Sequence, residues 1–148
     1  MKEITGILKM LGSGKAVNNQ AGKSFVHFSS VEIGDVVLQK LRTAQALGDY
    51  IERGLGQDVT LFLNGKMIIA VKLANGTVYY WKRSVLGPLL GAVPFLFAFL
   101  VLMTVTNSVL LSAVGAIALY GLVFGGDLKQ LLVVQPKFDA MGGVSLKS

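Results

Sequence analysis

Few side chains in this sequence are of the types that carry out enzymatic chemistry. The chain has 148 residues, a single histidine, His27, and no cysteine. A serine nucleophile therefore has only His27 as a histidine base, and thiol or cysteine–zinc chemistry is excluded. The eight Asp and Glu residues are scattered without a spacing typical of a catalytic pair. We predict that the protein is not an enzyme and has no metal or cofactor.

Residues 12–16, GSGKA, partly match a phosphate-binding loop. That loop requires a glycine where Lys9 stands and Ser or Thr where Ala16 stands, and no helical pattern follows it. We therefore do not predict nucleotide binding. His27, between Val26 and Phe28, is more typical of a structural histidine than of a functional one.

Charge is distributed unevenly along the chain. Residues 1–84 contain 11 of the 14 Lys and Arg and 6 of the 8 Asp and Glu, a net charge of +5. Residues 84–126 are 43 consecutive positions without Asp, Glu, Lys, Arg or His. One membrane span needs about 20 apolar residues, so this block is about two spans long. The alternative is a buried hairpin of a soluble protein, but the rest of the chain is too small to cover such a block.

The uncharged block divides at its one polar cluster, TVTNS at residues 104–108. We predict one membrane span at residues 85–105, a tight turn at 106–108 and a second span at 109–124. No ionisable residue lies inside the block, so a proton relay, an ion-coupled site or a voltage sensor is not expected.

Positive charges flank the block on both sides. Lys82 and Arg83 precede it, Lys129 and Lys137 follow it, and the predicted turn carries no charge. The positive-inside rule therefore predicts that both termini are cytoplasmic. The first residues lack an apolar run of signal-peptide length, so residues 1–84 are expected to stay in the cytoplasm. The expected location is a bacterial-type inner membrane, crossed twice.

Aromatic residues stand just before the block. Tyr79, Tyr80 and Trp81 suit the aromatic belt at a membrane interface, with Lys82, Arg83 and Lys129 as charged anchors. The same three aromatic residues also suit the core of a strand. Both interpretations remain open.

Small residues recur at four-residue spacing within the block and favour close helix packing. They pack the hairpin against itself or against another subunit, and the sequence leaves both alternatives open. Pro94 is expected to kink the first span. The predicted packing residues are Gly87, Gly91, Ser112, Ala116, Gly121 and Gly125.

The segment before the block alternates between strand and helix patterns. Two Asn-Gly pairs divide an apolar alternating stretch into three strands, as expected for a meander. A helical three- and four-residue spacing precedes it. The predicted elements are strands at 3–11, 24–30, 58–63, 66–74 and 77–83 and a helix within residues 33–58 that has Asp35 as its N-cap and ends at Gly54 or Gly56, with the polar residues 12–23 as a flexible loop.

Part of this segment resembles a cold-shock domain, an oligonucleotide-binding (OB) fold. The motif SFVHFSS at residues 24–30 resembles the second ribonucleoprotein motif of that family, and GQDVTLFL at 56–63 resembles a later strand. The resemblance implies a small OB-like antiparallel β-barrel and assigns Phe25, His27 and Phe28 to contact with bases. The family's first motif, rich in glycine and aromatic residues, has no counterpart here.

The predicted organisation is a cytoplasmic OB-like β domain with one helix at residues 1–84, a two-helix transmembrane hairpin at 85–126 and a cytoplasmic tail at 127–148. The tail contains an apolar pattern that suits a short strand or an interfacial helix ended by Pro136. The class is therefore an α+β membrane protein.

The absence of catalytic groups and the paired glycines favour a non-catalytic subunit or adaptor of an oligomeric inner-membrane complex. Its expected partners are the lipid bilayer and further copies or other membrane subunits, with the β domain binding a partner. Two alternatives remain: a pore-forming or membrane-perturbing effector, and a membrane-tethered single-stranded nucleic-acid binder. The positive charge of the β domain favours lipid contact over nucleic acid.

Overall fold

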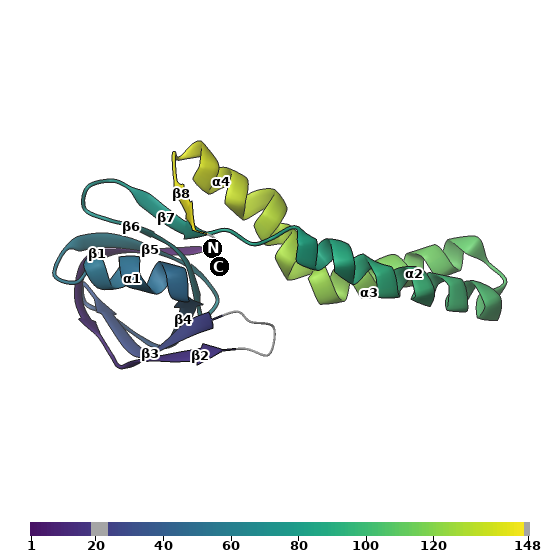
Figure 1. The fold of residues 1–148 in the computed structure, drawn as a ribbon, viewed down its shortest axis with the longest axis horizontal. Coiled ribbons are helices and arrows are strands. Elements are labelled where there is room, and N and C mark those ends of the chain that lie inside the picture. Colours follow the sequence, from purple (N-terminus) through teal and green to yellow (C-terminus); the bar gives the residue numbers. More distant parts are fainter. Residues whose placement is uncertain (19–23, 147–148) are drawn as a thin grey trace. The chain divides into compact units, whose positions relative to one another are not determined.

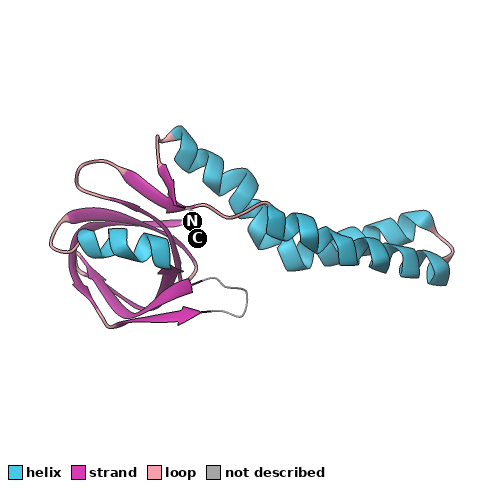
Figure 2. Ribbon diagram, in the orientation of Figure 1, coloured by secondary structure: helices cyan, strands magenta, loops and turns pink. Residues whose placement is uncertain are grey.

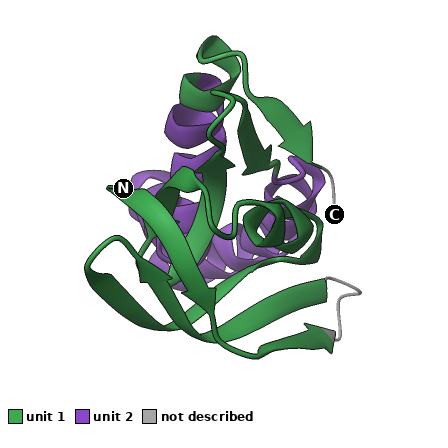
Figure 3. Cartoon of the chain, turned by 90° about the vertical axis from the view of Figure 1, so that its left-hand side faces the viewer, with its two compact units in different colours: residues 1–82, 137–148 green, residues 83–136 purple. Residues whose placement is uncertain are grey.

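The chain folds into two compact units. The computed structural model describes residues 1–18 and 24–146. Residues 1–82 and 137–148 form the first unit, called here the β unit, and residues 83–136 form the second, called the helix pair (Figure 3). Every strand among the described residues belongs to the β unit (Figures 1 and 2). The predicted α+β class, with a β-rich first part and two apolar helices, is confirmed.

The order of elements along the chain can be followed in Figure 1. The elements are β1 (Lys2–Leu11), β2 (Gly14–Asn18), β3 (Ser24–Ile33), β4 (Val36–Ala44), α1 (Gln45–Arg53), β5 (Asp58–Asn64), β6 (Met67–Lys72), β7 (Val78–Trp81), α2 (Leu86–Thr106), α3 (Val109–Lys129), the wide π-helical turn η1 (Gln130–Val134), α4 (Gln135–Ala140) and β8 (Val144–Leu146).

Five strands of the β unit form a closed circuit of pairings. Antiparallel pairs join β5 to β1, β1 to β3, β3 to β4 and β5 to β6, and a parallel pair joins β4 to β6. Strand β2 adds to β3, while β7 and β8 continue from β6. The strands and α1 together bury apolar side chains that are 1% exposed or less, each contributing about 1.5–3 kcal/mol of hydrophobic burial: Leu8, Val31, Ile33, Leu47, Ile51, Leu61, Ile68, Ile69 and Val71.

The predicted strands are confirmed in existence and close in length. The strand predicted at 58–63 is β5, and those at 66–74 and 77–83 are the shorter β6 and β7. The strands predicted at 3–11 and 24–30 are β1 and β3.

The helix predicted within residues 33–58 is only partly correct: its end at Gly54 is confirmed, but its start at Asp35 is wrong. Residues 36–44 are the strand β4, and the helix α1 covers Gln45–Arg53 alone. Gly34, with φ +57°, forms a two-residue turn that folds β4 back onto β3. β4 pairs with β3 along its length and with β6 at Arg42 and Thr43, so tertiary context outweighs the helical spacing of its apolar residues.

Two more strands lie where loops or open alternatives were expected. Residues 14–18 of the predicted flexible loop form the edge strand β2, while residues 19–23 lie outside the described residues. Of the two alternatives for the apolar pattern before Pro136, the helix is correct, since α3 continues through η1 into α4, and the strand β8 lies further along the chain. Pro136 does not end the helix, since the wide turn η1 before it accommodates the missing N–H.

The C-terminal segment completes the core of the β unit. Phe138 is 1% exposed and packs against Phe62 and Tyr80, with ring centroids at 5.1 and 5.4 Å. The Tyr80 hydroxyl donates a hydrogen bond to the Asp139 carboxylate. Burial, with the hydrogen bond to Asp139 and its negative charge, raises the pKa of Tyr80 to about 12. Strand β8 then pairs in parallel with β7.

The helix pair consists of two antiparallel apolar helices. Leu86–Thr106 and Val109–Ala140 are long and apolar enough to cross a membrane, with mean hydropathies of 2.3 and 2.0. The turn between them lies where it was predicted: Asn107 adopts φ +50° and the Ser108 hydroxyl accepts from the Leu111 N–H. The second helix extends well beyond the predicted end of the span at residue 124.

Truncation of Phe138 tests how far the C-terminal segment stabilises the β unit. Phe138→Ala should lower the free energy of unfolding by about 3–5 kcal/mol, because it leaves a cavity beside Phe62 and Tyr80. Trp81 is the single tryptophan and is 2% exposed, so its fluorescence during urea unfolding of the full chain in detergent reports on this unit. Phe97→Ala, at a 67% exposed position of α2, should leave the midpoint unchanged.

The Tyr80–Asp139 pair predicts a pH effect. A raised folded-state pKa means that the stabilising contribution is complete below pH 10 and is lost as pH rises through about 12. Asp139→Asn should lower the pKa of Tyr80 part of the way toward 10, because the negative charge is removed while burial remains. Phenolate absorbance at alkaline pH, with Tyr80→Phe to assign the transition, measures this. An unchanged transition in Asp139→Asn would show that burial alone sets the pKa.

Candidate functional site

The candidate site is the surface of the helix pair, built first from a seam of small side chains. Ser112 is fully buried and Ala116 is 8% exposed, both on the side of α3 that meets α2. The Ser112 hydroxyl lies 2.7 Å from the Ser108 carbonyl oxygen, to which it donates, and 2.9 Å from the Thr106 hydroxyl. Thr106 also donates to the Leu102 carbonyl at 2.8 Å. These polar groups therefore have partners within the helix pair, as an apolar solvent requires.

Gly91 provides the room for an aromatic ring. A Cβ atom at Gly91 would overlap the Phe124 ring of α3. Phe95 lies edge-on to Tyr120 at 5.3 Å and to Phe124 at 6.1 Å. The Tyr120 hydroxyl donates to the Pro88 carbonyl oxygen at 2.9 Å. Gly91 thus contributes to packing within the helix pair rather than to its outer surface.

The other three predicted packing glycines face open space. A Cβ atom at Gly87, Gly121 or Gly125 would meet no atom within 4 Å. On α3, Gly121 and Gly125 directly follow Tyr120 and Phe124, which contact α2, and one position along a helix turns a residue by about 100°. The structure therefore divides the six predicted packing residues into two groups. Gly91, Ser112 and Ala116 form the seam inside the pair, whereas Gly87, Gly121 and Gly125 are open. Gly121 and Gly125 of α3 are called here the open glycine face.

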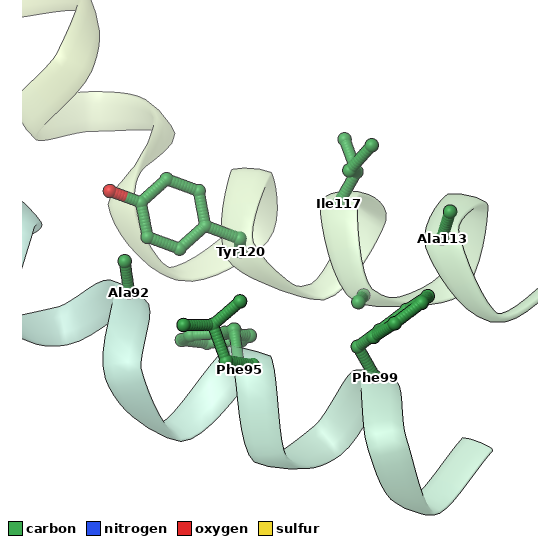
Figure 4. A pocket seen from close by; sticks show the side chains of 8 residues that line it. Ala92, Phe95, Phe99, Ala113, Ile117 and Tyr120 are labelled. Carbon is green, nitrogen blue, oxygen red and sulfur yellow. The ribbon is translucent and has the colours of Figure 1, made fainter. Parts of the chain in front are cut away.

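An apolar pocket of about 360 Å³ opens between the helices beside the seam. Figure 4 shows Phe95 and Phe99 of α2 opposite Tyr120 and Ile117 of α3. Alanine side chains, which leave room between these larger groups, line the rest: Ala92, Ala113 and Ala116, together with Leu96. The pocket therefore offers only apolar surface.

A polar cluster forms at the end of the pair where both helices meet the rest of the chain. The Arg83 guanidinium forms an ion pair with Asp127, and the Gln135 side-chain amide donates to the Arg83 carbonyl oxygen at 3.3 Å. Sequence reasoning treated Arg83 as a membrane anchor and missed Asp127 as its partner. The signal was available, because Arg83 and Asp127 are the charges that bound the uncharged block on either side. Lys129 is exposed.

The aromatic residues before α2 belong to the β unit. Tyr80 and Trp81 are 1% and 2% exposed, so both are core side chains. Tyr79 is partly exposed and stacks on Tyr50 with ring centroids 4.1 Å apart. Lys82 is exposed.

The three residues that the cold-shock resemblance assigns to base contact differ in accessibility. Phe28 is 2% exposed and lies in the core. Phe25 is partly exposed and meets Trp81 edge-on at 5.8 Å. His27 is exposed on β3. Of the three, only His27 presents its ring freely to solvent.

No family model, curated protein or solved structure matches this chain.

The seam predicts a position-specific sensitivity of α3. Ser112→Leu should destabilise the helix pair by about 1–3 kcal/mol, because the larger side chain separates α2 from α3. Ala118→Leu introduces the same side chain at an exposed position of α3 and should change stability by less than about 0.5 kcal/mol. Thermal unfolding of the full chain in detergent, followed by helical circular dichroism, measures both. Equal effects at the two positions would contradict the seam.

Proposed function

We propose that this protein is a non-catalytic integral membrane protein that acts as a subunit or adaptor of an oligomeric membrane complex. The helix pair crosses a bacterial-type inner membrane twice and associates there with another copy or another subunit. The β unit, an OB-like barrel in this proposal, binds a partner in the cytoplasm. The closed circuit of five strand pairings supports the OB-like assignment.

One observation carries the proposal. The helices expose apolar side chains over most of their surface, since none of the apolar window of α2 and only 11% of that of the second helix is buried. In water such a surface would cost a large hydrophobic free energy, whereas in lipid it costs nothing. A lipid environment is therefore the one in which this helix pair is stable.

The charges at the end of the pair support the proposed topology. Arg83 and Asp127 pair at the end where α2 begins and α3 leaves the uncharged block, and the turn at Asn107 and Ser108 at the other end carries no charge. An uncharged turn is the end more easily moved across a bilayer. Both termini then remain in the cytoplasm.

The open glycine face supports association. Lipid tails are as apolar as leucine, so helices in a bilayer associate through close packing rather than through the hydrophobic effect. Gly121 and Gly125 lie one turn apart with no side chain over them, which lets a neighbouring helix approach their backbone. The seam around Ser112 is already used inside the pair and is not available for this contact.

Substitution of the open glycines tests this association. Gly121→Leu combined with Gly125→Leu should convert the complex to a monomer or release its co-purifying subunit. Val109→Leu combined with Val123→Leu, at exposed positions of α3 that already carry side chains and lie on other faces of the helix, should leave it intact. Crosslinking in membranes and native mass measurement in mild detergent report the assembly. A monomeric wild-type chain without a co-purifying protein would overturn the proposal.

A further inference from the structure

The strand register gathers positive charge on one face of the β unit. Lys15 of β2 pairs with His27 of β3, and His27 pairs with Arg42 of β4. All three residues are exposed. Neighbouring strands are about 4.8 Å apart, so this row places three basic side chains across about 10 Å.

A pocket of about 470 Å³ lies beside this row. Lys15, His27 and Lys40 line it together with Ser13 and Ser29, and the apolar side chains of Phe28 and Leu41 line the remainder. Lys40 stands in the middle of β4 with φ +55°, a left-handed conformation that a lysine rarely adopts. Such backbone outliers concentrate at binding sites. We call this pocket and the adjoining Arg42 the basic groove.

The basic groove has no acidic counterpart. Residues 4–31 and 36–48, which contain all of its members, include no Asp or Glu. Among the described residues, the ion pairs of the β unit involve Lys9 and Lys137 and none of the groove cations. The positive charge of the groove is therefore not neutralised within the described part of the chain.

Ammonium groups and hydroxyls together suit a phosphate group. Lysine binds phosphate as a point charge, and serine hydroxyls donate hydrogen bonds to its oxygens. Two phosphate-bearing partners are then conceivable, an anionic lipid and a single-stranded nucleic acid.

The aromatic side chains decide between these partners. Binding of single strands depends on exposed rings on which bases stack. Phe28 is buried and Phe25 is turned edge-on to Trp81, so the groove lacks a stacking platform among the described residues. In addition, only residues 82–85 separate β7 from α2, so a membrane that holds the helix pair is always near the β unit.

We infer that the basic groove binds the phosphate headgroup of anionic lipid in the membrane that contains the helix pair. This inference rests on the proposed membrane function. The groove gives the protein a preference for anionic over zwitterionic lipid, because a zwitterionic headgroup has no net negative charge. Each Lys or Arg near an anionic membrane surface strengthens binding to that surface about fivefold.

The single histidine allows a direct test on the full chain. His27 lines the groove and is the only imidazole, so its ring resonances report on this site without a label. The full chain, freed of any purification histidines and held in non-ionic detergent at fixed pH, is titrated separately with phosphatidylglycerol, phosphatidylcholine, inorganic phosphate and a single-stranded oligonucleotide. Phosphatidylglycerol alone should shift the His27 resonances at low concentration.

Two charge variants provide the matched comparison. Lys15→Gln combined with Lys40→Gln should raise the half-saturating phosphatidylglycerol fraction by about 25-fold, from two contributions of about fivefold. Lys2→Gln combined with Lys72→Gln removes the same charge at exposed positions outside the groove and should change it by less than about twofold. Circular dichroism verifies that both variants are folded.

Each other outcome would overturn the inference. Equal shifts with phosphatidylglycerol and phosphatidylcholine would exclude recognition of headgroup charge, and equal losses in the two variants would exclude the groove. Shifts by inorganic phosphate at the same concentration would indicate a free anion, and tighter binding of the oligonucleotide would indicate nucleic acid. A chain that stays soluble without detergent would refute the proposed membrane function instead, so the two failures are distinguishable.

Discussion

The need to satisfy every backbone and hydroxyl group without water governs the helix pair. A block of 43 residues without a charged side chain can enter lipid only if its peptide groups bond to one another, and two helices achieve this. Where the chain reverses, the polar residues find partners within the helix pair: the Ser108 hydroxyl accepts from the Leu111 N–H, and the Ser112 hydroxyl donates to the Ser108 carbonyl oxygen. The reversal therefore occurs where several polar side chains of the block stand together and provide hydrogen bonds.

The β unit has a different constraint, because it must bury its apolar residues with few strands. The last strand, β8, has three residues and would not be stable alone. Phe138 and Asp139, just before it, hold the segment through the rings of Phe62 and Tyr80 and through the Tyr80 hydroxyl. Residues on both sides of the helix pair in the sequence thus belong to one core, so the β unit is complete only after the helix pair has been synthesised.

Local patterns in the sequence predicted the parts of the fold that depend on local physics. The absence of charge located both helices, and Asn107 with its polar neighbours located the turn. The strand β4 was mistaken for a helix because Leu41 and Ala44 have helical spacing, although the Gly34-Asp35 pair before it is a two-residue hairpin signal. Nothing local could reveal the parallel pairing of β4 with β6 or of β7 with β8, because these pairings depend on distant segments.

The residues of the candidate sites also differ in whether local sequence patterns or only the structure identifies them. Spacing identified the small residues of α3, but only the structure separates Ser112, which packs inside the pair, from Gly121, which faces open space. The basic groove was invisible as a motif, because Lys15, His27 and Arg42 come together only through the register of three strands. Basic composition indicated a negatively charged partner without indicating where it would bind.

The two proposed contacts depend on different forces and are therefore separable. Packing at Gly121 and Gly125 depends on the close approach of uncharged backbones and is insensitive to salt. The basic groove depends on unneutralised charge near the membrane surface, where ionic screening acts over about 8 Å at physiological salt. A change in ionic strength or in headgroup charge should thus affect the groove without affecting the helix contact.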